Sequence, residues 1–316
     1  MIIGGAAAGL TSALYSSRQG LSTLVITKDI GGQALLTNDI QNYPGIDQIG
    51  GFELMTKFQE QAARYGAKFL YDEVKSIENR KEEKIVSTTT AEFSATALIL
   101  AFGKTPRDLG VPGEQEFRGK GVSYCAVCDG PIFRGKNVSV AGAGDHALQA
   151  AVYLSGVASK VNLILPTNDL RGDEDLVNSV KEDKKIEKSF SRKVGEIKGD
   201  RVVNSISLRK QNGEIAEEIE TNAIFVEMGY IAKTDFVKDI VKLNADKEIV
   251  VDKYCATSAE GIFAAGDVTD VPYKQAVISA GQGSTAALSA YNYIQKLRGK
   301  PASKTDWKSV NPVSSK

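Results

Sequence analysis

Two glycine-rich turns, each between a strand-like and a helix-like stretch, constrain the fold of this chain most. Residues 4–9 read Gly-Gly-Ala-Ala-Ala-Gly after the apolar residues 1–3, and residues 142–147 read Gly-Ala-Gly-Asp-His-Ala after the expected strand 137–141. Glycines in such a turn let the backbone approach a pyrophosphate, and the free N–H groups of the following helix meet its negative charge. One such turn is weak evidence, but two in the same context predict two nucleotide-binding domains of α/β class.

Both turns depart from the ideal glycine pattern. Ala6 replaces the middle glycine of the first turn, and Ala147 replaces the third glycine of the second turn. The strand expected at residues 21–27 ends in Thr27 and Lys28 rather than in the acidic residue that commonly binds a ribose hydroxyl. The assignment of each domain therefore depends on the repetition of the turn as much as on either turn alone.

Hydrophobic patterns place further elements around the two turns. The unbroken apolar run 97–101 predicts a buried parallel strand, and the run 261–265 predicts another that ends at a glycine and a carboxylate. The remaining elements follow from periodicity and turn residues. They are helices at 10–18, 51–65, 148–155 and 275–294, strands at 161–165 and 248–253, antiparallel meanders at 68–93 and 193–227, and linkers at 111–114 and 229–232.

Length and composition exclude several classes of protein. The 316 residues are enough for two ordinary domains. Lys and Arg number 39, as do Asp and Glu, so no net field attracts nucleic acid or a membrane surface. No apolar run has the length of a transmembrane helix, and no signal peptide is visible. Three cysteines do not suit a disulfide-stapled secreted scaffold, so we expect a cytoplasmic protein.

A pair of cysteines stands between the two turns, and a carboxylate directly follows it. Cys125 and Cys128 are separated by two residues and precede Asp129. Such a pair can close a redox-active disulfide or contribute half of a zinc site. A zinc site normally needs four Cys or His ligands, and the remaining Cys255 and His146 lie far away in sequence. We therefore predict redox chemistry and no metal.

Taken together, these motifs resemble those of low-molecular-weight thioredoxin reductases, a family of flavoprotein disulfide reductases. The resemblance covers nearly the whole chain. The cysteine stretch and the Ala-Ala-Gly-Asp sequence at 264–267, in this order and spacing, are its most diagnostic parts. Beyond the two turns, it rests on residues 31–33 (Gly-Gly-Gln), 42–45 (Asn-Tyr-Pro-Gly), 120–130, 261–267 and 272–276.

The resemblance implies a three-layer α/β fold with two Rossmann-like domains. The FAD-binding domain would be discontinuous and comprise residues 1–113 and 231–316. A NAD(P)-binding-like domain of residues 114–230, which carries the cysteines, would be inserted between them. The family also implies a homodimer and a swivel of one domain on the other at the two linkers.

The resemblance further implies an oxidoreductase that passes electrons from NADPH or NADH through FAD to a disulfide between Cys125 and Cys128. The final acceptor would be thioredoxin or a thioredoxin-like or glutaredoxin-like protein. Cys128 would face the flavin, and Cys125 would be the interchange thiol that attacks the partner. Asp129 would give and take the proton of the thiol pair.

For the cofactors, the resemblance implies residues at both turns and at a late helix. Gly4, Ala6 and Gly9 would hold the FAD pyrophosphate, and Gly266 and Asp267 would hold the ribityl chain. The backbone at a helix start would stabilise negative charge on the reduced flavin. The residues expected there and at other flavin contacts are Gln275, Ala276, Lys274, Gly31, Gly32, Gln33 and Asn42, and those expected at the nicotinamide nucleotide are Gly142, Gly144, Asp145, His146 and Arg171.

The segment that reads NADPH in this family departs from its usual His-Arg-Arg-x-x-x-Arg pattern. Residues 165–171 read Leu-Pro-Thr-Asn-Asp-Leu-Arg, so only Arg171 remains. A 2′-phosphate carries about two charges and favours a guanidinium fork, which leucine, proline and threonine cannot supply. No acidic residue ends the strand to hold a free 2′-hydroxyl, unless Asp169 reaches it. NADH, poor use of both nucleotides, and another electron donor stay open.

Two further readings of the function remain open at this point. The same fold could work as a flavin-dependent dithiol oxidase, or as a reductase with a donor other than a nicotinamide, and the loss of the arginines favours either. A non-catalytic flavin-binding regulatory protein is the third reading, against which the intact Cys125, Cys128 and Asp129 argue. His146 fits a cofactor-edge position better than a catalytic base, because no partner for catalysis is identifiable.

Overall fold

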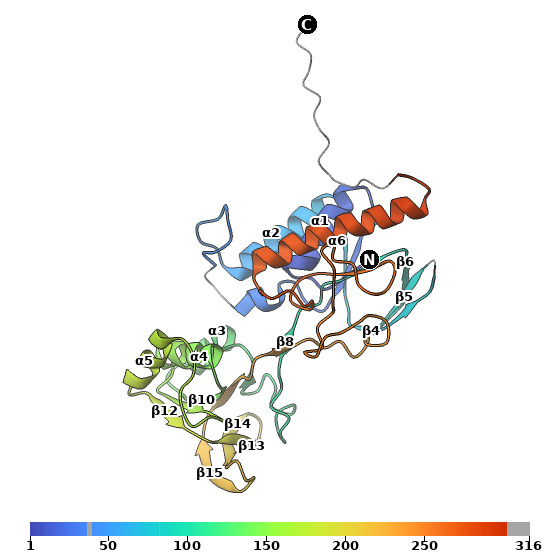
Figure 1. Cartoon of the computed structure of the whole chain (residues 1–316). Coiled ribbons are helices and arrows are strands. Elements are labelled where there is room, and N and C mark those ends of the chain that lie inside the picture. The colour runs from blue at the N-terminus through green and yellow to red at the C-terminus, as the bar shows by residue number, and fades with distance from the viewer. Residues whose placement is uncertain (37–39, 82, 302–316) are drawn as a thin grey trace. The chain divides into compact units, whose positions relative to one another are not determined.

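The structure is a computed structural model that describes residues 1–36, 40–81 and 83–301. Its internal contacts divide the chain into two compact units (Figure 1). The first unit comprises residues 1–34, 41–103 and the chain from Ala232 onward, and the second comprises 35–40 and 104–231. Each unit contains one glycine turn and one parallel sheet, as the α/β class with two Rossmann-like parts predicts.

A five-stranded parallel sheet forms the centre of the first unit. Its inner strands come from short apolar runs buried on both faces, which is the pattern of parallel sheets covered on two sides. In spatial order the strands are β18 (Ile262–Ala264), β7 (Leu98–Leu100), β1 (Ile2–Ile3), β2 (Leu24–Thr27) and β3 (Lys68–Tyr71).

Helices and a second sheet cover the two faces of this parallel sheet. The helices α1 (Ala7–Arg18), α2 (Gly51–Arg64) and α6 (Ala276–Leu297) lie side by side (Figure 1). Isoleucines and valines of the antiparallel sheet share a buried cluster with Ile3, Ile26 and Leu98. That sheet consists of β4 (Val74–Asn79), β5 (Lys84–Thr88) and β6 (Glu92–Ala95), and a short helix η1 (Gly32–Leu36) follows β2.

The second unit repeats this plan. Its central sheet is again parallel and five-stranded, with the order β12, β11, β10, β16, β9. The strand bounds are β9 (Val122–Ser123), β10 (Asn137–Gly142), β11 (Lys160–Ile164), β12 (Ile186–Ser189) and β16 (Ala223–Glu227). The helices are α3 (Ala126–Asp129), α4 (Asp145–Ser155), α5 (Glu174–Glu182) and η2 (Gly130–Phe133).

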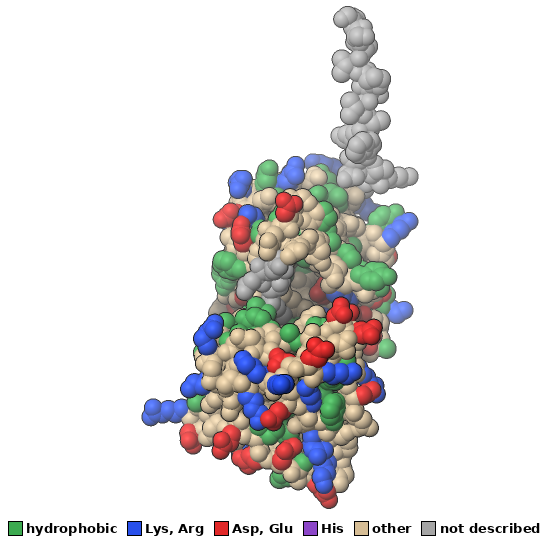
Figure 2. Space-filling model, turned by 90° about the vertical axis from the view of Figure 1, so that its left-hand side faces the viewer, with side chains coloured by type: hydrophobic (Ala, Val, Ile, Leu, Met, Phe, Trp, Pro, Cys, Tyr) green, Lys and Arg blue, Asp and Glu red, His purple; other side chains and the backbone are tan. Residues whose placement is uncertain are grey.

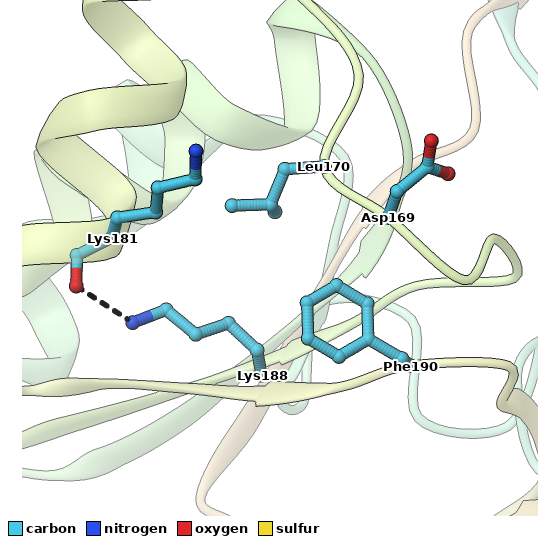
Figure 3. A pocket seen from close by; sticks show the side chains of 5 residues that line it. All are labelled: Asp169, Leu170, Lys181, Lys188 and Phe190. Atoms are coloured by element: carbon cyan, nitrogen blue, oxygen red, sulfur yellow. Dashed lines mark hydrogen bonds between the residues drawn. The ribbon is translucent and has the colours of Figure 1, made fainter.

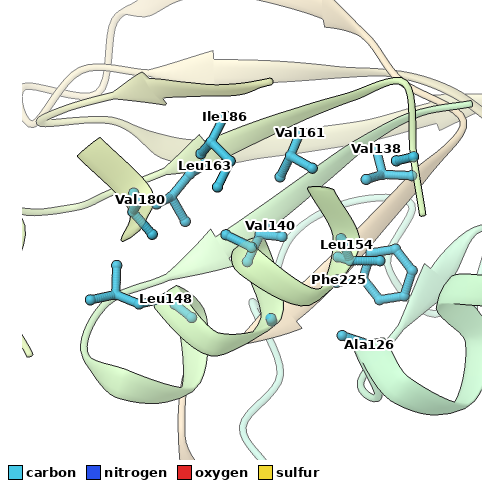
Figure 4. Close-up of a cluster of buried hydrophobic side chains, with 14 of the residues drawn as sticks. Ala126, Val138, Val140, Leu148, Leu154, Val161, Leu163, Val180, Ile186 and Phe225 are labelled. Atoms are coloured by element: carbon cyan, nitrogen blue, oxygen red, sulfur yellow. The ribbon is translucent and has the colours of Figure 1, made fainter. Parts of the chain in front are cut away.

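Side chains that alternate along the strands of the second unit fill two separate cores. Val140, Leu163 and Phe225 point toward the helices and pack with Leu148 and Leu154 (Figure 4). Neighbouring residues such as Ile164 and Ile224 point to the opposite face and pack against the antiparallel sheet. That sheet consists of β13 (Lys193–Gly199), β14 (Val203–Arg209) and β15 (Ile215–Glu220), and the short strands β8 (Thr105–Pro106) and β17 (Tyr230–Ile231) pair with each other.

Several expectations from the sequence were wrong in detail. Residues 68–71 and 223–227, predicted as parts of meanders, instead join the two parallel sheets. Residues 248–253 form no strand but only isolated bridges at Ile249. The sequence pattern could not distinguish these cases, because the period of a strand is the same in a parallel sheet and in a meander. The strand at 97–101 and the helices at 51–65 and 275–294 were confirmed to within a few residues.

The surface of the molecule mixes acidic and basic side chains on the face drawn in Figure 2, in keeping with the zero net charge. Within the ranges that the structure describes, none of the helices has both the length and the apolar character needed to cross a bilayer.

The contact between α1 and α6 depends on a glycine. A Cβ placed on Gly283 would lie 2.3 Å from the backbone oxygen of Ala8, so the helices can approach only without a side chain there. The Ser12 hydroxyl donates a hydrogen bond of 2.9 Å to the Gly283 carbonyl across the same contact. The absence of a side chain at Gly283 thus allows α1 and α6 to pack in direct contact.

We expect Gly283→Ala to lower the stability of the protein by about 1–3 kcal/mol, because the added methyl group overpacks the α1–α6 contact. Gly281→Ala on the same helix is the matched control, since no atom lies within 4 Å of its added Cβ. Alanine is the better helix former, so the control should gain up to about 1 kcal/mol. Urea unfolding measures both, and a G283A protein as stable as G281A would contradict this account.

Candidate redox and nucleotide sites

The two cysteines form a disulfide at the carboxyl edge of the second unit's parallel sheet. Cys125 lies two residues after β9, and Cys128 lies within the single turn of α3. Their Cα atoms are 5.3 Å apart and the bond joins residues three apart in sequence. The predicted redox pair is therefore brought together by local structure alone. The third cysteine, Cys255, is free and buried in the first unit.

Backbone and side-chain hydrogen bonds organise the turn around the disulfide. The Cys128 N–H donates to the Cys125 sulfur at 3.0 Å. The Cys125 N–H donates to the Ser123 hydroxyl at 3.1 Å, and that hydroxyl donates to the Asp129 carboxylate at 2.6 Å. An N–H aimed at a sulfur stabilises its thiolate, so this arrangement favours a thiolate on Cys125 once the disulfide is open.

The cysteine turn is anchored to the core and borders a cavity. Ala126 is buried in the cluster that contains Leu154 and Phe225. On the other side of the turn, Ser123 and Asp129 line a cavity of about 410 Å³. Exposed apolar residues and two lysines line the same cavity; they are Ile132, Val202, Lys120 and Lys136.

A second carboxyl group lies at this edge of the sheet. Glu227 is the last residue of β16 and is only 9% exposed. Burial raises the pKa of Glu227 to about 7, and the backbone N–H of Ala126 beside the carboxyl partly offsets this rise. Burial and the charge of Glu227 raise the pKa of Tyr230 to about 12. The ring of His146 contacts the Tyr230 ring at a centroid distance of 5.6 Å.

In the first unit, the glycine turn at residues 4–9 contacts the glycine pair at residues 31–32. The Gly31 N–H donates to the Gly5 carbonyl at 2.9 Å, and a Cβ on Gly32 would lie 3.1 Å from the Ala6 side chain. Gly4 has a φ of 114°, and a Cβ there would lie 2.2 Å from the Ala101 carbonyl oxygen. The helix α1 begins without a side-chain cap and without an acidic residue in its first turn.

The other residues predicted for the flavin also belong to this unit. Asn42 donates to the Gln275 side chain at 3.2 Å, and the Ser279 hydroxyl donates to Asp267 at 3.0 Å. Ala276 is the first residue of α6, whose N-terminus has no side-chain cap. Lys274 is engaged in an ion pair with Glu248 at 3.0 Å. Gln33 lies in η1, and Gly266 adopts a φ of 80° beside the Ala8 side chain.

These observations show that the first unit fits an anionic dinucleotide. Two helix N-termini, those of α1 and α6, have N–H groups that no side chain caps. The glycine turn has no room for a Cβ at Gly4 or Gly9, so no side chain of these residues covers the backbone at the start of α1. Such a cradle is what the pyrophosphate of FAD requires.

The second glycine turn has the same geometry at its start. A Cβ on Gly142 would lie 2.1 Å from the Glu227 carbonyl oxygen, and Gly144, with a φ of 79°, precedes α4. The carboxylate of Asp145, in the first turn of α4, accepts the Asp173 N–H at 2.7 Å. Asp145 therefore fastens the loop after β11 to the start of α4.

That loop is the segment expected to read the 2′-phosphate of NADPH. Its one cation, Arg171, pairs with Asp169 at 3.0 Å. Leu165 is buried, so it offers nothing to a ligand. On the α5–β12 side of the loop, a cavity of about 460 Å³ is lined by Asp169, Leu170, Lys181, Lys188 and Phe190 (Figure 3). The side chains of the loop thus do not fit a 2′-phosphate. The positive charge that lines the cavity comes from Lys181 and Lys188.

Comparison with known proteins agrees with this geometry. The family model described as "Pyridine nucleotide-disulphide oxidoreductase" matches residues 1–283. The chain belongs to this family. It is 38% identical over 301 residues to a thioredoxin reductase of Bacillus subtilis, which covers 94% of this chain and 95% of the relative. The chain is therefore a homologue of thioredoxin reductases, a family of flavoprotein oxidoreductases.

Solved structures of relatives support the same conclusion. Thioredoxin reductase of Lactococcus lactis matches with a TM-score of 0.81 and 34% identity, covering 93% of this chain and 98% of the other. A ferredoxin-flavin thioredoxin reductase of Clostridium acetobutylicum matches with a TM-score of 0.53 and 31% identity, covering 95% and 97%. Family membership implies FAD and a nicotinamide donor in general terms.

Two residues of the redox site were not predicted from the sequence. Ser123 links the Cys125 backbone to Asp129, and Glu227 lies beside Ala126. The spacing of Ser123 and Asp129 could have identified the serine, because the two residues lie six apart and flank the cysteine turn. Glu227 carried one signal, a lone carboxylate at the end of the apolar run 223–226, but only the sheet order places it near the cysteines.

Glu227 should make the stability of the protein depend on pH. Its pKa of about 7 exceeds the value of 4.5 that is usual for an exposed glutamate, so the folded state retains a proton that the unfolded state loses as pH rises from about 4.5 to 7. The free energy of unfolding therefore falls across this pH window, and the ionisation of Glu227 changes it no further at higher pH. We expect Glu227→Gln to remove this fall, worth up to roughly 3 kcal/mol.

Urea unfolding at pH 5 and pH 8 measures this effect as the difference between wild type and variant at each pH. Glu220→Gln, at an exposed carboxylate of β15 in the same unit, is the matched control and should follow the wild type. Equal pH dependence in E227Q and wild type would show that Glu227 does not hold a proton in the folded state.

Proposed function

We propose that this protein is an FAD-dependent reductase of thioredoxin or of a thioredoxin-like or glutaredoxin-like protein. The observation that carries the proposal is the Cys125–Cys128 disulfide, followed by Asp129, at the carboxyl edge of a parallel sheet beside a glycine turn. The identity to thioredoxin reductases over nearly the whole chain supports it. When bound, FAD supplies the two-electron carrier that this chemistry needs.

The hydrogen bonds of the turn favour different roles for the two cysteines. Cys125 accepts the Cys128 N–H, so its thiolate is the better stabilised one and suits the nucleophile that attacks a partner disulfide. Cys128 would then be the sulfur that leaves when the internal disulfide is opened. Asp129, oriented by the Ser123 hydroxyl, would hold the proton that the thiol pair gains and loses.

The cofactor would be held by residues of the first unit. Gly4, Ala6 and Gly9 would face the pyrophosphate at the start of α1, and Asp267 would bind the ribityl hydroxyls. The uncapped N–H groups at Gln275 and Ala276 would stabilise negative charge on the flavin ring. Gly31, Gly32, Gln33, Asn42, Gly266 and Lys274 would complete the site.

A protein partner fits the surface next to the disulfide. Ile132 is 73% exposed and Val202 is 58% exposed, and both line the cavity that includes Asp129. Exposed apolar side chains beside a reactive group favour binding of another protein surface over a small solute. The FAD-binding domain at residues 1–113 and 231–316, the inserted domain at 114–230, the homodimer and a cytoplasmic, reducing location belong to the same proposal.

The electron donor is a separate question, and the structure favours one without a 2′-phosphate. Arg171 is already paired with Asp169, and residues 165–170 offer no other cation. NADH, bound at Gly142, Gly144, Asp145 and His146, is one candidate. A donor other than a nicotinamide is the other, and the similar Clostridium protein is named a ferredoxin-flavin thioredoxin reductase.

We expect Cys125→Ser or Cys128→Ser to abolish reduction of thioredoxin, by at least about a hundredfold in kcat, because disulfide exchange needs both thiols. Flavin reduction should persist in both variants. Stopped-flow absorbance of the flavin band and an insulin-coupled thioredoxin assay measure the two steps. Cys255→Ala is the control and should stay active, since its thiol is buried in the first unit. Turnover by C125S would contradict the assignment.

Anaerobic addition of NADH and NADPH to the purified flavoprotein identifies the donor. We expect bleaching of the flavin band by NADH or by neither nucleotide. Rapid bleaching by NADPH that is lost in a Lys181→Gln, Lys188→Gln variant would show that the lysine-lined cavity replaces the missing arginines. Bleaching only by a reduced ferredoxin would favour the non-nicotinamide donor, and oxygen consumption with dithiols would favour an oxidase.

A further inference from the structure

Glu227 is a buried carboxyl group that the proposed chemistry of Cys125, Cys128 and Asp129 does not use. It ends β16, which lies between β10 and β9 in the parallel sheet. Residue 227 therefore stands between the glycine turn that follows β10 and the cysteine turn that follows β9. Its backbone lies opposite Gly142 in the β10–β16 pairing.

The strand register places Glu227 level with the first cysteine. Phe225 of β16 pairs with Ser123 of β9, and the strands are parallel. Glu227 lies two residues beyond Phe225, and Cys125 lies two residues beyond Ser123. Neighbouring strands are about 4.8 Å apart, so both residues leave the sheet at the same edge. The contact between the Glu227 carboxyl and the Ala126 backbone N–H agrees with this placement.

The groups around Glu227 supply little compensation for a negative charge. Tyr230 of β17 is the ionisable group coupled to it, and it is neutral at physiological pH. His146 of α4 contacts the Tyr230 ring, and Asp129 of α3 is held by Ser123 on the same cysteine turn. Throughout the ranges 1–36, 40–81 and 83–301, no ion pair involves Glu227. A buried carboxylate without a cation is costly, so the group holds a proton more readily than usual.

We propose that Glu227 is a positioning residue of the redox disulfide, which holds the Ala126 N–H and whose proton is coupled to the redox state of Cys125 and Cys128. The inference rests on the redox role of this cysteine pair. Reduction by a dithiol breaks the S–S bond and closes the disulfide of the dithiol, so two electrons pass to the protein. One of the two protons released by the dithiol goes to Cys128, which becomes a thiol, and the other goes to solvent, so that Cys125 is left as a thiolate. A thiolate on Cys125 and a carboxylate on Glu227 repel each other, so Glu227 binds its proton more tightly when the disulfide is open.

Equilibrium with dithiothreitol tests this coupling in the full-length flavoprotein. The exchange of one protein disulfide for one dithiothreitol disulfide is electron-balanced, and alkylation of the free thiols after quenching gives its equilibrium constant. Each constant is measured between pH 6 and pH 8 for wild type, Glu227→Gln and Glu227→Asp. Glutamine keeps an oxygen that accepts the Ala126 N–H, so E227Q removes the charge alone, whereas aspartate keeps the charge.

We expect the wild-type constant to equal that of E227Q near pH 6, where Glu227 is protonated in both redox states. By pH 8 it should fall about fivefold below that of E227Q, because a coupling of about one pKa unit, starting from a pKa of about 7, reaches its full tenfold effect only above pH 8. The pKa of the Cys125 thiol, from the pH dependence of its alkylation rate, should be about one unit lower in E227Q. E227D should retain the fall of the equilibrium constant between pH 6 and pH 8 that the wild type shows. Glu220→Gln should leave this fall unchanged.

A ratio of the wild-type to the E227Q equilibrium constant that does not change from pH 6 to pH 8 would overturn the proposal, because a purely structural role of the side chain predicts that result. If E227Q does not fold, the NMR signal of the Glu227 carboxyl in the wild type still decides, since an equal pKa in the oxidised and the reduced protein excludes the coupling. The assay requires no thioredoxin. A protein that fails to reduce thioredoxin but shows the fall would refute the proposed function and leave this inference standing.

Discussion

The close approach of a glycine to a neighbouring carbonyl is the constraint on which both halves of the molecule depend. In the first unit a Cβ on Gly4 would lie 2.2 Å from the oxygen of Ala101, and in the second a Cβ on Gly142 would lie 2.1 Å from that of Glu227. Any side chain would force apart two adjacent parallel strands at their carboxyl ends. The glycines therefore let a strand pass directly into a helix whose N–H groups face outward.

This constraint also explains where the chemical groups collect. Parallel strands present all their carboxyl ends at one edge, so the residues that follow them converge although they lie far apart in sequence. Cys125 follows β9, Glu227 ends β16 and Asp145 follows β10 in the second unit. In the first unit the same rule brings Asp267, after β18, to the edge that holds the Gly4 turn.

The cysteine turn and the loop after β11 differ in how well they suit the roles proposed for them. The disulfide, Asp129 and the hydrogen bond through Ser123 form a complete and ordered turn. The loop after β11 instead ties its one arginine to Asp169. Both side chains of this pair are exposed, so the pair itself is weak, but the loop holds no second cation that could form a fork around a phosphate. Reduction of a partner disulfide and choice of donor are thus separable properties of this fold, because they reside on different strands.

The two glycine turns, the cysteine pair, the absence of arginine at 165–170 and the α/β class were readable from the sequence, because each depends on residues that are adjacent in the chain. The sequence pattern misplaced 68–71 and 223–227, since a strand's periodicity does not state which sheet it joins. Only the tertiary structure decided that Glu227 stands beside the cysteine turn, 99 residues after Cys128. Strand order sets that proximity, and strand order follows from which apolar faces can be buried together.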